Sequence, residues 1–82
     1  MSKVIYQVVQ DMGHDGTESI GFNQTLAGAT RRAQAQDRSR GYLLTPHAWQ
    51  PRGANMEPDG TGSIECSVPG CHTSIAIHPI GA

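Results

Sequence analysis

Aromatic residues are scarce in this chain of 82 residues, which has one Trp, two Tyr and one Phe. Only 37% of the residues are hydrophobic, which is enough for one small core. No apolar run reaches the roughly 20 residues of a membrane-spanning helix, and the first residues lack the pattern of a signal peptide. We therefore expect one small domain over residues 1–82, in the cytoplasm, without membrane contact, as a monomer or small homo-oligomer.

Lysine is nearly absent as well, and the cations are unevenly distributed along the chain. Lys3 is the only lysine, and all five arginines lie between Arg31 and Arg52. Residues 25–40 carry four arginines against one aspartate, a net charge of +3, whereas residues 53–82 carry three acids and no cation. Because the overall charge is −1, the molecule as a whole lacks the basic surplus of a typical nucleic-acid binder. A basic segment instead lies between two acidic ones.

Short β-branched segments predict a small sheet. The segment VIYQVV, residues 4–9, is apolar on both of its faces, which predicts a central strand. Five prolines and ten glycines predict much loop, above all an irregular Pro/Gly-rich segment at about residues 45–62. Further strands are predicted at 18–24, 42–44, 64–68 and 71–77.

One amphipathic helix is predicted between the second and third strands. Thr25 is a good N-cap, and Leu26, Ala29 and Ala33 follow at the three- and four-residue spacing of one helical face. The helix should run from Leu26 to about Arg38. The sequence therefore predicts an α+β fold, with an antiparallel sheet of four to five strands and one helix packed on one face, in the order β-β-α-β-β-β.

Both cysteines and two of the four histidines lie within residues 63–78, SIECSVPGCHTSIAIH. Two thiols and two imidazoles in so short a segment suggest a zinc site, with Cys66, Cys71 and His72 as candidate ligands. The same segment also predicts a β-hairpin around a Pro69-Gly70 turn. The two alternatives differ in where the side chains point.

In such a hairpin, strand alternation places both cysteines on the inner, apolar face, where Ile64 opposes Ile75. His72 and His78 lie on the outer face, about 20 Å apart along one strand, so one tetrahedral zinc cannot collect both thiols and both imidazoles. We favour the hairpin, with the cysteines as unbonded core thiols and no metal or cofactor. A disulfide is a further alternative, which a reducing compartment disfavours.

Catalytic constellations are not evident. Cys71 and His72 are adjacent on a predicted strand and so point to opposite faces. His14 and Asp15 are neighbours in a turn-rich loop, where aspartate is common for reasons of backbone conformation. A chain of this size also rarely provides the concave pocket that general acid–base work needs. We therefore expect a protein that is not an enzyme.

The arginines of the helix are the better functional signal. At 100° per residue, Arg31 and Arg38 nearly superimpose on the outer face, with Gln34 beside them and Arg32 flanking them. They could grip phosphates or acidic side chains, or simply form a solvated face. Trp and Arg are also enriched at interface hot spots, although the only tryptophan could instead cover the small core. The candidate partner-binding residues are Arg31, Arg32, Arg38, Arg40, Trp49 and Arg52.

The segments VIYQVVQD and ESIGFNQTLAGATRRAQAQDRSRG resemble small phage-encoded anti-CRISPR proteins that act on type I CRISPR systems. Those proteins also pair two N-terminal strands with a helix of the form Ser/Thr-x-x-x-Ala-x-x-x-Ala, which Thr25, Ala29 and Ala33 match. The resemblance covers roughly residues 3–45. It implies a phage or prophage inhibitor, active in the bacterial cytoplasm, that evades host defence by docking on a multisubunit CRISPR surveillance complex and blocking recognition of target DNA. Direct nucleic-acid binding by the same arginines is the alternative, and a small zinc module ranks behind both.

Overall fold

The computed structural model describes residues 3–43, 48–68 and 70–80 of the chain. It has one α-helix packed against a five-stranded antiparallel sheet, so the predicted α+β fold is confirmed. The elements in chain order are β1 (Val4–Asp11), a short 3-10 helix η1 (Gly13–Asp15), β2 (Thr17–Asn23), α1 (Leu26–Ser39), β3 (Asn55–Met56), β4 (Gly62–Glu65) and β5 (Thr73–Pro79).

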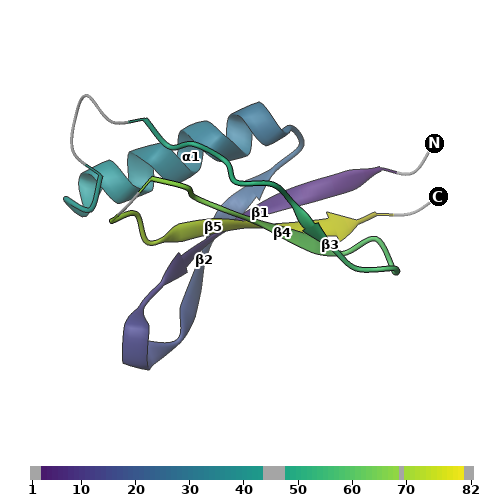
Figure 1. Ribbon diagram of the computed structural model, residues 1–82, viewed down its shortest axis with the longest axis horizontal. Coiled ribbons are helices and arrows are strands. Elements are labelled where there is room, and N and C mark those ends of the chain that lie inside the picture. Colours follow the sequence, from purple (N-terminus) through teal and green to yellow (C-terminus); the bar gives the residue numbers. More distant parts are fainter. Residues whose placement is uncertain (1–2, 44–47, 69, 81–82) are drawn as a thin grey trace.

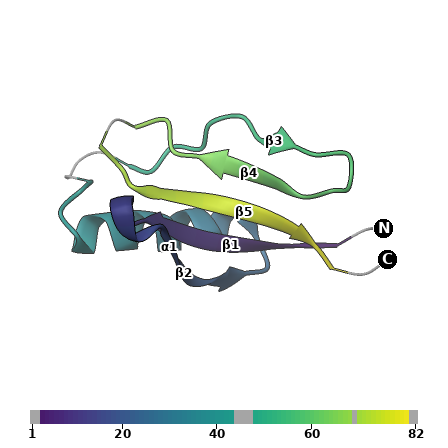
Figure 2. The ribbon, with the colours of Figure 1, turned by 90° about the horizontal axis from the view of Figure 1, so that it is seen from below.

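The strands lie side by side in the order β2-β1-β5-β4-β3, and every neighbouring pair is antiparallel. Figure 1 shows α1 lying along one face of this sheet. Figure 2 shows the molecule from below, with β1 and β5 in front of α1. The core lies between the sheet and the helix, as in other two-layer domains.

β1 is a central strand, as its two apolar faces predicted. It pairs with β2 on one side and with β5 on the other, and Val8 on its helix-facing side is fully buried. The register of the C-terminal hairpin is also confirmed, since Ile64 of β4 lies opposite Ile75 of β5. Both isoleucines are buried against the helix layer.

The helix begins where its cap residue predicted. The Oγ1 atom of Thr25 accepts a hydrogen bond of 3.1 Å from the Gly28 backbone N–H, which satisfies one of the free donors of the first turn. Ala29 and Ala33 face the sheet and have no exposed surface. Their short side chains let the helix backbone approach the strands closely, which compensates for the few large apolar residues of this chain.

The third strand lies elsewhere than expected, so the order of elements differs slightly from the prediction. Tyr42 and Leu43 form a bend rather than a strand, because their backbone N–H groups both donate to the Asp37 carbonyl at the end of α1. Leu43 instead buries its side chain in the core. Residue 44, the last of the predicted strand, lies outside the described residues.

Part of the segment expected to be irregular, at about 45–62, belongs to the sheet. β3 pairs with β4 there, and Gly62 is the first residue of β4. Before β3, Pro51 forms an isolated bridge to Cys66. The described part of this segment, from residue 48 on, therefore runs beside the end of β4 and is held there by backbone hydrogen bonds, including Ser67 N–H to the Gln50 carbonyl.

Candidate functional site

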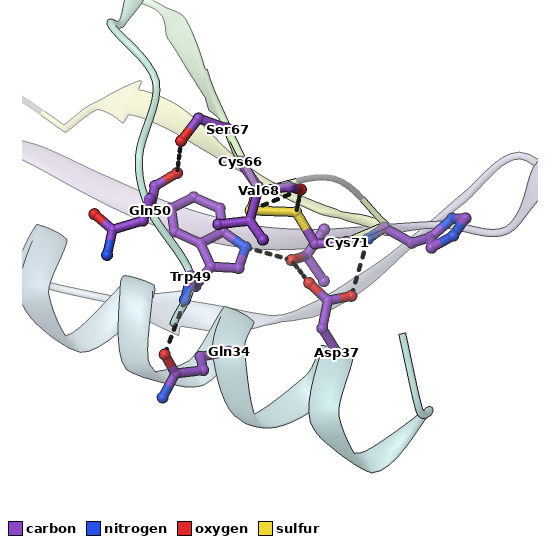
Figure 3. The surroundings of a disulfide bond; sticks show 10 residues. Gln34, Asp37, Trp49, Gln50, Cys66, Ser67, Val68 and Cys71 are labelled. Carbon is purple, nitrogen blue, oxygen red and sulfur yellow. Dashed lines mark hydrogen bonds between the residues drawn. A yellow bond between two sulfur atoms is a disulfide. The ribbon is translucent and has the colours of Figure 1, made fainter. Parts of the chain in front are cut away.

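A buried carboxylate organises the end of the core beneath the last turn of α1. Asp37 has no exposed surface, and it continues the inward stripe of Ala29 and Ala33 by four residues. Its Oδ2 accepts a hydrogen bond of 2.5 Å from the Thr73 hydroxyl, and its Oδ1 accepts one of 3.0 Å from the His72 backbone N–H. The carboxylate therefore anchors α1 to the start of β5, as Figure 3 shows.

Trp49 belongs to the same buried network. Its indole Nε1–H donates to the Thr73 hydroxyl at 2.8 Å, and only 2% of its surface is exposed. Its backbone N–H donates to Gln34 Oε1 at 2.9 Å, so Gln34 faces this segment rather than the outer face of the helix. These contacts correct the expectation that Trp49 lies at a partner interface. Because the chain has so few large apolar side chains, Trp49 is needed to fill the core.

The two cysteines are bonded to each other. Cys66 and Cys71 form a disulfide across the turn between β4 and β5, with their Cα atoms 6.6 Å apart (Figure 3). The expectation of unbonded thiols is therefore wrong. The last residue pair between β4 and β5 is Glu65 with Ser74, and Cys66 and Cys71 lie beyond this pair, within bonding range of each other. Both cysteines pack against the core, as strand alternation predicted.

The alternative zinc site does not form in this structure. His72 is exposed, and its ring packs on Tyr42 with the two ring centroids 4.1 Å apart. Both cysteine sulfurs are occupied by the disulfide and cannot act as thiolate ligands. Among the described residues, no group of three or more His, Cys, Asp or Glu side chains is arranged to hold a metal ion.

The helix arginines lie at the surface and divide between two sides of α1. Arg31 and Arg38 are exposed, and their seven-residue separation places them about 20° apart around the helix axis. Arg32 is directed toward β2, where its Nε donates to Asn23 Oδ1 at 2.9 Å. Gly21 makes room for it, since a Cβ there would lie 2.8 Å from Arg32 Nη1.

The remaining two candidates are exposed as well but lie off the regular helix. Arg40 is the C-cap residue of α1, and its backbone N–H bonds carbonyls of the last turn. Arg52 lies on the segment beside β4, where its backbone N–H donates to the Glu65 carbonyl at 2.7 Å. Four of the five arginines are therefore on or next to α1, and the fifth is on a separate segment.

The burial of Asp37 changes the electrostatics of this helix. Asp37 is the sole acidic residue among residues 25–40, and it faces the core while Arg31, Arg32, Arg38 and Arg40 face solvent. The exposed side of the helix therefore presents arginine charge without a carboxylate of its own. Sequence reasoning missed this role of Asp37, although its position four residues after Ala33 was a usable signal.

No protein family, no curated protein and no solved structure matches this chain. Within residues 3–43, 48–68 and 70–80, the structure contains no helix with the length and apolar character that crossing a bilayer requires.

Proposed function

We propose that this chain is a small, non-enzymatic binding protein that docks on an acidic surface through the arginines of α1. The observation that carries the proposal is the burial of Asp37, which leaves only arginines as charged groups on the exposed side of the helix. Guanidinium groups bind carboxylates and phosphates through paired hydrogen bonds, so an anionic partner fits this surface.

The acidic residues of the chain support a directional docking mode. The six other acids of the chain all lie outside α1 and are exposed: Asp11, Asp15 and Glu18 on the β1–β2 hairpin, and Glu57, Asp59 and Glu65 between β3 and the end of β4. The strands and their turns therefore carry the exposed acidic charge, and α1 carries arginine charge. Such segregation steers an anionic partner toward α1.

The partner we propose is a nucleic-acid-handling protein assembly, and specifically a type I CRISPR surveillance complex. The resemblance of residues 3–45 to anti-CRISPR proteins supports this choice, and the strand-strand-helix arrangement of β1, β2 and α1 is consistent with it. Bound there, the protein would act as a phage or prophage inhibitor that blocks recognition of target DNA. It would act stoichiometrically and without turnover.

The test is co-elution of the purified protein with a type I surveillance complex in size-exclusion chromatography. We expect the double charge reversal Arg31→Glu/Arg38→Glu to weaken binding by at least tenfold, because two favourable charge contacts become repulsive. The matched control Lys3→Glu/Arg52→Glu changes the net charge equally but leaves α1 intact, so it should weaken binding less. Absence of a stable complex with the unmodified protein would refute this choice of partner.

Direct nucleic-acid binding is the second candidate, and the same exposed arginine charge of α1 favours it. Phosphate contacts release counterions, so the logarithm of the affinity would fall by about one unit per contact for each tenfold increase in salt. A fluorescence-anisotropy titration with a single-stranded and a double-stranded oligonucleotide measures that slope. A slope of three or more that drops in the Arg31→Glu/Arg38→Glu variant would favour nucleic acid over a protein surface.

A further inference from the structure

The disulfide is accessible from solvent through a small pocket. An open pocket of about 250 Å³ at the end of the β4–β5 hairpin is lined by both cysteines together with Asp11, Glu65 and His72. Cys66 and Cys71 are half-buried rather than fully enclosed. A small molecule that enters the pocket therefore lies beside both residues of the disulfide, unlike at a disulfide whose residues are fully buried in a core.

The turn also places a hydrogen-bond acceptor near both cysteine sulfurs, which matters for the reduced form of the pair. The Val68 carbonyl oxygen lies 3.0 Å from Cys71 Sγ and 3.8 Å from Cys66 Sγ. In the disulfide neither sulfur carries a hydrogen, so these are contacts and not hydrogen bonds. After reduction, both thiols could donate to this oxygen, which has two lone pairs. The dithiol would then have an acceptor close to both sulfurs once the sulfurs separate.

We propose that the Cys66–Cys71 disulfide is a thiol–disulfide exchange site that reacts with small thiols and favours cationic ones. In the first step a thiolate attacks one cysteine sulfur, and the other cysteine leaves with the bonding electron pair and takes up a proton. A second thiolate then attacks the incoming sulfur of the mixed disulfide and releases the remaining cysteine, which is protonated in turn. Two small thiols are oxidised to one small disulfide, and the protein disulfide is reduced to two thiols.

The charge preference follows from the lining of the pocket. Asp11 and Glu65 are the two acidic residues that line it, and both are exposed. They attract a thiol that carries an ammonium group and repel one that carries a carboxylate, by an amount that salt reduces. The proposal does not depend on the helix arginines, so it stands or fails independently of the docking function.

The experiment compares three thiols of similar size: cysteamine (cationic), 2-mercaptoethanol (neutral) and 3-mercaptopropionate (anionic). Alkylation followed by mass spectrometry counts the protein thiols over time at low ionic strength. Each rate is divided by the rate for the Asp11→Asn/Glu65→Gln variant, which cancels the intrinsic reactivity of the thiol. We expect ratios of about three for cysteamine, about one for 2-mercaptoethanol and about one third for 3-mercaptopropionate.

The control variant Asp15→Asn/Glu57→Gln removes the same charge from exposed positions that do not line the pocket. It should leave all three rates close to those of the unmodified protein, and circular dichroism should show a folded protein throughout. Equal ratios for the three thiols would overturn the proposed entry through this pocket. Reduction that occurs only in denaturant would overturn the exchange site itself, as would a purified protein with two free thiols in the absence of reductant.

Discussion

Thr73 donates its hydroxyl hydrogen to Asp37 Oδ2 at 2.5 Å, and this hydrogen bond joins β5 to the last turn of α1. The same hydroxyl oxygen accepts from Trp49 Nε1 at 2.8 Å. Asp37 and Trp49, the two side chains that Thr73 contacts, are buried, so bulk water cannot replace these hydrogen bonds if they are lost. The Thr73 hydroxyl therefore links three parts of the chain by hydrogen bonds: β5, to which it belongs, Asp37 of α1, and Trp49 in the segment that follows the helix.

Replacing Thr73 with valine removes this link while keeping the shape of the side chain. We expect Thr73→Val to lower the free energy of unfolding by about 2–4 kcal/mol, because a buried carboxylate loses a donor and a buried indole N–H loses its acceptor. Urea denaturation followed by Trp49 fluorescence measures the change. Thr73→Ser keeps the hydroxyl and should cost much less, so equal losses for the two variants would contradict this role.

The close approach of α1 to the sheet can be tested at Ala33. This residue has no exposed surface, whereas Ala35 on the same helix is exposed. We expect Ala33→Leu to lower the free energy of unfolding by about 1–3 kcal/mol, since the added atoms force the helix away from the strands. Ala35→Leu should stay within about 0.5 kcal/mol of the unmodified protein. If Ala33→Leu leaves the free energy of unfolding unchanged, α1 and the sheet are not in close contact at this position.

Removing the disulfide should cost stability chiefly through the unfolded state. The Cys66–Cys71 bond closes a loop with a sequence separation of 5, for which the chain-entropy relation gives about 2 kcal/mol. We therefore expect Cys66→Ala/Cys71→Ala to lower the free energy of unfolding by about that amount in guanidinium titrations. The single variant Ser67→Ala serves as a control for a change in the same turn, since it removes only the exposed hydrogen bond from Ser67 Oγ to the Gln50 carbonyl. A double variant as stable as the unmodified protein would show that the bond does not constrain the unfolded chain.

Asp59 gives a prediction on pH. The pKa of its carboxyl is lowered from its ordinary value, first by the hydrogen bond from the Thr61 hydroxyl and then by that from the Thr61 backbone N–H. Because the folded pKa lies below the unfolded one, this stabilisation is present above the unfolded pKa and is lost as the pH falls through the folded pKa.

An NMR titration of the Asp59 carboxyl carbon measures this effect. We expect Thr61→Ala to move the pKa back toward its ordinary value, because only the backbone donor remains. Thr61→Ser keeps the hydroxyl and should keep the pKa low. A pKa that does not respond to Thr61→Ala would assign the shift to the backbone alone.

Local patterns were sufficient for most of the architecture. The cap at Thr25 and the stripe through Ala29 and Ala33 predicted the helix, and the two apolar faces of residues 4–9 predicted a central strand. The opposition of Ile64 and Ile75 was predicted from a two-residue turn and is observed, although β4 ends at Glu65 and β5 begins at Thr73 rather than at residues 68 and 71. These features depend on residues near one another in sequence, so periodicity, capping and turn chemistry were enough to find them.

The errors have two different causes. Tyr42 and Leu43 have the side chains of a strand, but their N–H groups donate to the Asp37 carbonyl five and six residues earlier, so the end of α1 competes locally with strand formation. Trp49 was named as a partner-binding residue, with a place over the core as the alternative, and Thr73, 24 residues later, accepts its indole hydrogen within the core. Local propensity cannot anticipate a hydrogen bond whose partner is placed by the fold of the whole chain.

The sequence by itself determined that this chain forms an α+β domain with an arginine-rich helix and that both cysteines lie in one hairpin, because composition and spacing act locally. The tertiary structure alone decided that the cysteines bond to each other and that Asp37 is withdrawn from the helix surface. Both outcomes depend on which elements pack together, since burial and bond formation are properties of three-dimensional neighbours. The withdrawal of Asp37 turned a segment of mixed charge into a helix surface whose charged groups are all arginines.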